Sequence, residues 1–377
     1  MIYLDNAATS FPKPPQVSQA MTGVMAKFGA NPGRGGHRLS LQAGRVVEAC
    51  REAAAQLFGA HSPERVIFTR CCTESLNLAI SGMLHRGDEV ICSHGEHNAV
   101  MRLLDRYVSR GEITVKVLQP DDRGLLSPQV LRRAISPQTA LVILCHASNV
   151  TGVVQPVRDM GAVCRDRGVP LLVDAAQTAG ILDVTLDGLN ADMLAMPGHK
   201  GLMGPHGTGL LVLREGIDPD PLILGGTGSA SESFTQPVML PDRYESGTVN
   251  LPGIAGLLAG LRFVGRYRGE IHTYEQALNE RLRRQLRQMR GLSVLGEESA
   301  PRVGITSIVP DSGDSSAMAD ALDATGIAVR AGLHCAPAMH HWLGTMQSGA
   351  VRFSFGPYNT EQDADDAAAV VARLVKV

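Results

Sequence analysis

The sequence predicts an α/β protein built on a mostly parallel sheet, followed by a smaller α+β unit. Between residues 65 and 213, seven short β-rich runs alternate with amphipathic stretches, which is typical of a parallel sheet covered by helices. Several runs are continuously apolar, such as LVIL at 141–144 and LLV at 171–173. Such runs favour strands that are buried on both faces of the sheet.

The expected strands of the first unit follow one another at regular distances. In chain order they are RVIFT (65–69), DEVICS (88–93), ITVKVL (113–118), TALVILCHAS (139–148), VPLLVDAA (169–176), ADMLAM (191–196) and GTGLLVL (207–213). One intervening helix has a clear start, because Ser127 suits an N-cap and Pro128 suits the first helical position.

The pattern changes after about residue 257. A long helix is expected to run to roughly residue 290, and strands at 303–310, 327–332 and 350–356 then alternate with helices. We therefore expect a large unit at 1–257 and a small α+β unit at 258–377. Residues 1–20 are expected to form an N-terminal arm that packs on the small unit.

Composition excludes several classes of protein. The chain has 377 residues, 44% of them hydrophobic and 19% charged, with a net charge of −2, which favours a soluble, two-unit protein rather than one that binds nucleic acid or an anionic membrane. The first residues do not resemble a secretory signal, and no apolar run approaches the roughly 20 residues of a membrane span. We expect a cytoplasmic protein. The seven cysteines include no C-x-x-C pair, so neither a disulfide framework nor a zinc site is expected.

Three segments carry residues that could take part in binding or catalysis. Lys200 lies in the Gly-rich loop of MPGHKGLMGPHG (196–207) after an expected strand, where open α/β sheets bind ligands. A solvated surface lysine is the alternative. Asp174 ends an apolar strand, where an unpaired carboxylate would be costly; it pairs with a buried cation or caps a turn. Thr73 starts a helix after FTRCC, so it either helps to bind a phosphate or is only an N-cap.

The segments together match one family. LDNAATS (4–10), GEHNAV (95–100), SNVTG (148–152), VDAAQ (173–177), GHK (198–200), ESGTVN (245–250) and RAGLHCA (330–336) occur in its order and spacing. Over essentially the whole chain the sequence resembles the class V enzymes of fold type I, which depend on pyridoxal 5'-phosphate, and within them the cysteine desulfurases and selenocysteine lyases. The R-x-G-x-x-C segment at 330–335 is similar to the loop of the group II, or Suf-type, desulfurases.

The resemblance implies a role for each matching residue in holding pyridoxal phosphate. Lys200 would be joined covalently to the cofactor and later move protons at the substrate's α-carbon, and Asp174 would pair with the pyridinium nitrogen. The other implied cofactor contacts are Gln177 and Asn149 near the ring oxygen, His97 on the ring face, Cys72, Thr73 and His199 toward the phosphate, and Thr248 from a second subunit. This last contact implies a homodimer.

The resemblance also implies the residues that handle the substrate. Cys335 would be the nucleophile, with Arg330 and His334 as cations that favour its thiolate. Arg352 would bind the substrate's α-carboxylate, as a planar guanidinium does well, beside Arg330 and Asn149. His97 would donate or accept a proton.

Four positions depart from the common family pattern. Pro197 stands where many members have a phosphate-binding serine, and Cys71 and Cys72 stand where glycine and threonine are frequent. Leu333 replaces a common histidine in the cysteine loop. Proline offers neither a hydroxyl nor an N–H group, so the phosphate would depend on the remaining donors.

The expected activity is the conversion of L-cysteine to L-alanine, with a persulfide left on Cys335 for a possible sulfur-acceptor protein. A selenocysteine lyase is a close alternative, because selenide can leave without attack by a thiol. A class V aminotransferase or another lyase that uses pyridoxal phosphate is a further alternative. A sulfur-relay protein without cofactor chemistry is opposed by the joint presence of Lys200, Asp174, His97 and Arg352.

Overall fold

The structure, a computed structural model, describes residues 1–33, 35–229 and 231–375. Its centre is a seven-stranded sheet of the order β2-β8-β7-β6-β5-β3-β4. The strands in chain order are β2 (Val66–Thr69), β3 (Glu89–Ser93), β4 (Thr114–Leu118), β5 (Thr139–Cys145), β6 (Leu171–Asp174), β7 (Met193–Pro197) and β8 (Gly209–Leu213). Neighbouring strands are parallel except at β8, which is antiparallel to both β2 and β7. The predicted mostly parallel sheet of seven strands is therefore confirmed.

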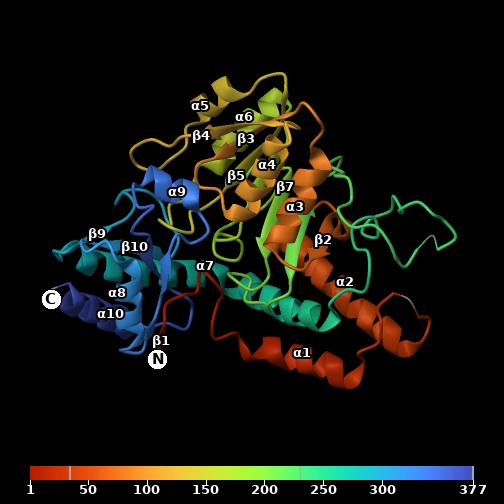
Figure 1. Ribbon diagram of the computed structural model, residues 1–377. Coiled ribbons are helices and arrows are strands. Elements are labelled where there is room, and N and C mark those ends of the chain that lie inside the picture. The colour runs from red at the N-terminus through yellow and green to blue at the C-terminus, as the bar shows by residue number, and fades with distance from the viewer. Residues whose placement is uncertain (34, 230, 376–377) are drawn as a thin grey trace.

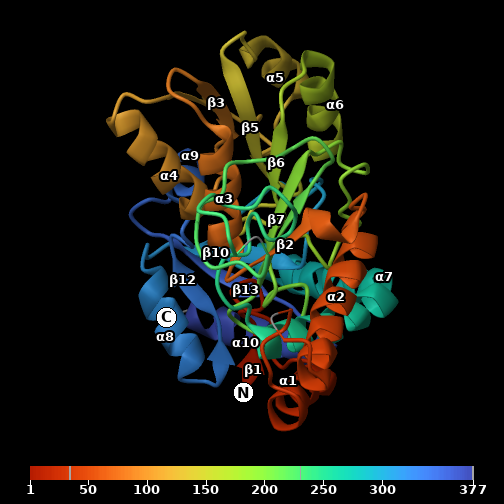
Figure 2. The same ribbon diagram turned by 90° about the vertical axis from the view of Figure 1, so that its right-hand side faces the viewer.

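Both faces of this sheet are buried, as the continuous apolar runs predicted. Alternate residues of β5 point to opposite faces: Val142 and Leu144 pack with α2 (Arg38–Phe58), α5 (Pro128–Ala134), α6 (Val157–Arg167) and the start of α7 (Leu251–Arg287). Leu141 and Ile143 pack with α3 (Cys72–Met83) and α4 (Asn98–Ser109) on the other face. Figure 1 and Figure 2 show the helices on both sides of the strands.

The second part of the chain is built on a four-stranded antiparallel sheet. Its order is β12 (Arg330–Gly332), β13 (Ala350–Ser354), β10 (Ile305–Pro310) and β9 (Leu292–Val294). The helices α8 (Ser315–Asp323) and α10 (Glu361–Leu374) lie against it, and the short α9 (Pro337–Trp342) follows the cysteine loop. These blue elements occupy one side of Figure 1.

The helix α7 connects the two sheets. It begins at Leu251, earlier than the sequence suggested, because the Asn250 side chain accepts a hydrogen bond from the Gly253 N–H and caps the first turn. It runs for 37 residues to Arg287, so the expected boundary at 257 falls inside one continuous helix. In Figure 1 this helix crosses beneath the large sheet and reaches the small one.

The N-terminal residues lie on the second part of the chain. The strand β1 (Ile2–Tyr3) pairs in parallel with β11 (Ile327–Ala328), and Leu4 is buried in the small unit's core. The chain then returns as α1 (Pro15–Lys27), which packs along α7. This path brings residues 4–10 to the junction between the two sheets.

Two local expectations differ from the structure. Strand β5 ends at Cys145 rather than at 148, because residues 146–154 form a turn closed by a bridge between Ala147 and Val154. Ser127 does occupy the N-cap position of α5, but its hydroxyl bonds to Gln129 rather than to the helix backbone.

A long segment, residues 214–250, joins β8 to α7, and its described part contains no helix or strand. The short 3-10 helix η1 (Pro63–Arg65) precedes β2. Its described part projects away from the sheet in Figure 1 and carries the exposed side chains of Leu224, Phe234 and Val238. Across the described ranges, no helix is long and apolar enough to span a membrane.

Candidate functional site

A cavity of about 180 Å³ lies where the parallel strands β5, β6 and β7 end. Its position follows the general rule that open α/β sheets bind ligands at the carboxyl ends of their strands. Segments from five parts of the chain meet there. The lining includes Cys71, Cys72, Thr73, His97, Cys145, Asn149, Asp174, Gln177, Pro197, His199 and Lys200.

Lys200 is held in the cavity by a tightly packed turn after β7. A β-carbon added to Gly198 would lie 2.0 Å from Thr208 Oγ1, and one added to Gly201 would lie 2.4 Å from the Ala179 carbonyl oxygen. Neither position can accept a side chain without movement, so both glycines fix the course of the turn. Burial lowers the pKa of the Lys200 ammonium, while the Asp174 carboxylate opposes the shift.

Asp174 is the last residue of β6, and its side chain is buried in the floor of the cavity. Its Oδ1 atom accepts a hydrogen bond of 2.9 Å from the Ala176 N–H, and the Cys72 thiol lies 3.7 Å from the same oxygen. Burial raises the pKa of the Cys72 thiol, and Asp174 adds to this rise. Cys72 is therefore a neutral donor beside the carboxylate.

His97 and Gln177 approach the cavity from two different loops. The Nδ1 atom of His97 accepts a hydrogen bond of 3.0 Å from the Ala99 N–H and caps α4, so the Nε2 atom is the one that carries the proton in the neutral ring. Burial lowers the pKa of His97. Gln177 donates from Nε2 to the Ala7 carbonyl oxygen at 3.2 Å.

The residues of the cavity fit pyridoxal phosphate. Helix α3 begins at Cys72, with Cys71 rather than Thr73 as the N-cap, so the first-turn N–H groups at Cys72 and Thr73 are available to an anion. The Nδ1 atom of His199 is buried and has no hydrogen-bond partner among the described residues. The unpaired imidazole nitrogen and the helix N-terminus suit a phosphate, the Asp174 carboxylate suits a protonated ring nitrogen, and the Lys200 amine suits a carbonyl carbon.

Cys335 follows β12 in a loop of unusual backbone geometry. His334 and Cys335 have φ angles of 49° and 57°, a conformation that non-glycine residues rarely adopt. The loop is held by the large unit: Asn149 Nδ2 donates to the His334 carbonyl at 2.6 Å, and the Asn98 N–H donates to the Cys335 carbonyl at 2.8 Å. Cys335 is partly exposed and lines a groove that also includes His97.

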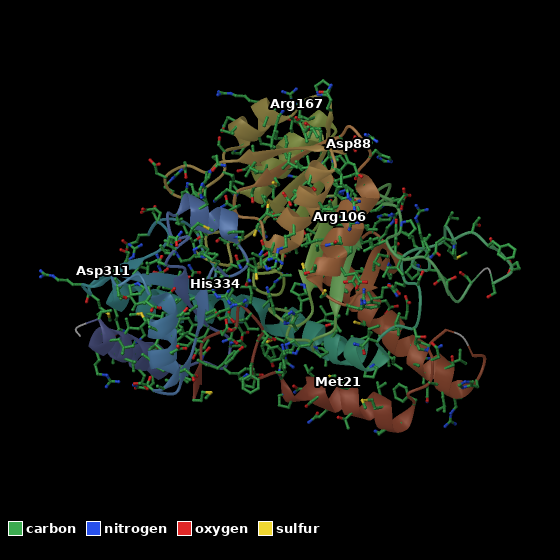
Figure 3. The ribbon with its side chains drawn as sticks, in the orientation of Figure 1. Met21, Asp88, Arg106, Arg167, Asp311 and His334 are labelled. Atoms are coloured by element: carbon green, nitrogen blue, oxygen red, sulfur yellow. The ribbon has the colours of Figure 1, made fainter. Side chains whose placement is uncertain are left out.

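The expected cationic role of His334 is wrong. This ring is buried, and its Nε2 atom lies 3.1 Å from the Ala350 carbonyl oxygen. Burial, with a smaller contribution from the Arg352 guanidinium, lowers the pKa of His334 to about 2. A neutral imidazole cannot favour the Cys335 thiolate by its charge, which leaves Arg330 as the expected cation of the loop. Figure 3 shows His334 inside the molecule, where the small unit meets the large one.

Arg330 and Arg352 are paired in register on the neighbouring strands β12 and β13. Arg352 is only 1% exposed; its Nη2 atom lies 2.8 Å from Asp5 Oδ1, and its Nη1 atom donates to the Asn149 carbonyl at 3.1 Å. Within the part of the chain that the structure describes, the Nε atom of Arg352 has no hydrogen-bond partner. Burial lowers the pKa of Arg352 and Asp5 opposes the shift, so Asp5 keeps a buried guanidinium charged.

Sequence reasoning missed two acidic residues of the site, Asp5 and Glu96. Glu96 is buried under the cavity and accepts hydrogen bonds from the Ser93 hydroxyl and the Cys145 N–H. Burial raises its pKa to about 8. Both residues lie inside the quoted motifs LDNAATS and GEHNAV, but only the folded chain shows what they contact.

Thr248 does not join the other site residues within one chain. It is exposed and lines a separate cavity of about 610 Å³ with residues of β2, α3 and the segment 244–250. The remaining expected residues lie around the Lys200 cavity or on the strands and loop beside it. Within the described residues, no cluster of three or more histidine, cysteine or acidic side chains could hold a metal ion.

Comparisons of the sequence with known proteins agree on one family. The sequence pattern described as "Aminotransferase class-V" matches residues 2–366. A probable cysteine desulfurase of Methanothermobacter thermautotrophicus is 35% identical over 96% of this chain and 92% of its own length. A second probable cysteine desulfurase, of Pyrococcus abyssi, is 33% identical over 100% of this chain and 94% of its own.

Solved structures agree with these sequence matches. The apo structure of a cysteine desulfurase from Thermococcus onnurineus superposes with a TM-score of 0.93 at 34% identity, covering 100% of this chain and 94% of the other. A cysteine desulfurase of Escherichia coli superposes with a TM-score of 0.89 at 28% identity, covering 99% and 94%.

Proposed function

The chain belongs to the class-V aminotransferase family, and from that premise we propose that it is a cysteine desulfurase that depends on pyridoxal 5'-phosphate. It would convert L-cysteine to L-alanine and hold the released sulfur on Cys335. One observation carries the proposal: Lys200 and Asp174 share a cavity, and Cys335 is fixed to the first residue of the helix that His97 caps.

When bound, pyridoxal phosphate supplies an electrophilic carbonyl carbon and a ring that withdraws electrons from the substrate's α-carbon. Asp174 would pair with the ring nitrogen and keep it protonated, while Cys72 donates to the same carboxylate. His199 and the first turn of α3 would hold the phosphate. Gln177 and Asn149 would lie near the ring oxygen.

Lys200 is suited to moving a proton at the substrate's α-carbon. Burial lowers the pKa of its ammonium, which increases the neutral fraction of the amine that can act as a base. Arg352 would fix the substrate by binding its α-carboxylate through a planar guanidinium. The Asp5 carboxylate and the Asn149 carbonyl already fix the plane of that guanidinium.

Cys335 would then attack as a thiolate on the sulfur atom of the substrate cysteine. A new S–S bond forms to Cys335, the substrate's Cβ–Sγ bond breaks, and its electron pair stays with the three-carbon skeleton. A proton delivered to Cβ gives alanine. Arg330 would favour the thiolate by its charge, and His97 would transfer protons during the step.

We also infer a homodimer with shared sites and a group II type of cysteine loop. Thr248 is exposed on the segment before α7 and would reach the phosphate in a second subunit.

The proposed compartment is the cytoplasm. The chain's seven cysteines are free thiols, the state that a reducing compartment such as the cytoplasm maintains.

Product analysis with Cys335→Ser tests the function. We expect the wild-type protein to release alanine and, with dithiothreitol, sulfide from L-cysteine, and the variant to release neither. Cys164→Ala, on the buried face of α6, is the matched control and should retain both products. Full activity of Cys335→Ser with cysteine would overturn the assigned nucleophile, and turnover of selenocysteine without any turnover of cysteine by the wild type would identify a selenocysteine lyase instead.

A further inference from the structure

A groove of about 370 Å³ opens beside Cys335, on the outer side of the cofactor cavity. Its floor and walls come from the first turns of α3 and from one face of α4, and it ends at the cysteine loop. The lining residues are Thr73, Asn77, His97, Asn98, Ala99, Arg102, Leu103, Arg106 and Cys335. Figure 3 shows Arg106 on α4, and Figure 2 shows this helix at the edge of the molecule.

Two arginines give this groove its charge. Arg102 and Arg106 are four residues apart on α4, so their side chains lie on the same face of the helix. Both are exposed, and in the described part of the chain neither has an ion pair or a side-chain hydrogen bond. Guanidinium groups that line a concave surface without a counter-charge are suited to bind carboxylates.

The acidic side chains of α3 and α4 do not line the groove. Glu74 pairs with Arg70 at 3.0 Å and lines a different cavity. Asp105 is on α4 between the two arginines in sequence, but it does not line the groove. The charged side chains that line the groove, Arg102 and Arg106, are therefore both positive. Of the charges outside the lining, Arg330 acts on His97 with the same sign, and the Asp174 carboxylate in the cofactor cavity acts on it with the opposite sign.

The proposed desulfurase reaction requires that something enters beside Cys335. After alanine leaves, the enzyme carries Cys335–S–SH, and turnover needs an acceptor thiolate. This thiolate attacks the outer sulfur, a new S–S bond forms on the acceptor, and the bond to Cys335 breaks. The products are the acceptor persulfide and the Cys335 thiolate, so no further oxidant or reductant is consumed.

We propose that this groove binds the sulfur acceptor, and that the acceptor is a thiol flanked by carboxylates. The inference rests on the proposed function and adds the chemistry of its second substrate. A free thiol acid and an acidic, cysteine-bearing peptide share this chemistry, and each can place carboxylates on Arg102 and Arg106 while its thiol reaches Cys335.

The test measures the second half-reaction apart from the first. The holoenzyme is loaded with one equivalent of L-cysteine, and the rate of persulfide loss is measured against the thiolate concentration of three probes. The probes are 2-mercaptoethanol, 3-mercaptopropionate and mercaptosuccinate, which carry none, one and two carboxylates. We expect the rate constant to rise on the order of tenfold along the series at low salt and to converge at high salt.

Variants locate the effect. Arg106→Ala should abolish most of the preference for mercaptosuccinate, and the double variant with Arg102→Ala should abolish all of it. Arg110→Ala is the matched control, because Arg110 is exposed at the end of α4 and does not line the groove. A rate that does not depend on the probe's charge, or an equal loss in the control, would overturn the proposal.

The alanine burst separates this result from a failure of the proposed function. A wild-type enzyme that forms no alanine from the loading dose is not a desulfurase. Normal alanine formation with a second step whose rate does not depend on the probe's charge would overturn only the proposal that the groove binds the acceptor. The peptide Asp-Cys-Glu, measured beside mercaptosuccinate, shows whether the acceptor is a peptide or a free thiol acid. The acceptor is of the same kind as the probe whose rate constant falls more in Arg106→Ala.

Discussion

The side-chain amide of Asn149 donates a hydrogen bond of 2.6 Å to the carbonyl oxygen of His334. Together with the bond from the Asn98 N–H to the Cys335 carbonyl, it ties the cysteine loop to the large unit at two consecutive residues. Both His334 and Cys335 have positive φ angles, which cost roughly 1–3 kcal/mol each when the surroundings do not enforce them. The two hydrogen bonds are part of what enforces them.

Loss of the Asn149 amide should therefore loosen the cysteine loop. Asn149→Ala is expected to lower the free energy of unfolding by about 1 kcal/mol, the usual net value of one hydrogen bond, and to increase amide exchange in residues 331–336. Hydrogen–deuterium exchange by mass spectrometry measures the second effect. Gln362→Ala, whose side chain donates a hydrogen bond to Asp366 on the surface, should change neither. Unchanged exchange in the Asn149 variant would show that the loop keeps its conformation without this hydrogen bond.

Arg352 should determine how tightly the substrate's carboxylate binds. Arg352→Lys keeps the charge but loses the planar fork, so we expect the KM for L-cysteine to rise roughly tenfold or more, as for the loss of one charge-assisted hydrogen bond. The value of kcat should fall less. Steady-state alanine formation measures both. Arg281→Lys, on the surface beside Asp365, is the control, and an unchanged KM in Arg352→Lys would contradict the assigned role.

Glu275 should make stability depend on pH. Its side chain on α7 is buried, no described residue hydrogen-bonds to its carboxyl group, and burial raises its pKa to about 8. The folded protein thus holds a proton that the unfolded chain releases near pH 4.5, and wild-type stability is lost as pH rises from there toward 8. Glu275→Gln cannot release a proton.

The stability of Glu275→Gln relative to the wild type should therefore increase with pH, by up to about 1.4 kcal/mol per pH unit. Urea unfolding at pH 5, 6, 7 and 8 measures this difference. Glu270→Gln, exposed on the same helix, should show no such trend. A constant difference between Glu275→Gln and the wild type would mean that Glu275 is ionised when folded.

Thr248 should act across the dimer. Thr248→Arg and Lys200→Ala are each expected to be inactive alone, because one obstructs the partner's phosphate site and the other lacks the lysine. When both chains are co-expressed, one site of each mixed dimer has intact residues from both chains. About a quarter of wild-type activity should return for random pairing of a C2 dimer. Activity no greater than the sum of the separate variants would place Thr248 outside the shared site.

The sequence could predict much of this fold because its strands are read from local patterns. Continuous apolar runs such as 141–144 and 171–173 identify buried strands whatever their neighbours. The start of α7 was missed because it depends on the Asn250 cap. The helices α1 and α2 precede the stretch in which strand and helix patterns alternate, and neither was among the expected elements.

The site shows a similar division. The residues of the motifs are set by their chemistry, and the structure brings most of them around one cavity. What the sequence could not give is the environment of each group. His334 was expected to be a cation because of its place beside Cys335, but its ring is buried against His340 of α9 and Ala350 of β13, contacts that arise only when the loop folds. Asp5 lies 347 residues from Arg352, and the pairing of β1 with β11 and the bridge between Asp5 and Ser354 of β13 bring them together.

The central claim is that Lys200 holds an aldehyde cofactor above the carboxylate of Asp174. The most direct measurement is to treat the purified protein, supplied with pyridoxal phosphate, with sodium borohydride, and to map the modified peptide by mass spectrometry. We expect one pyridoxyl group per chain, on Lys200, and a much reduced yield in Asp174→Ala. Modification of another lysine, or of none, would contradict it.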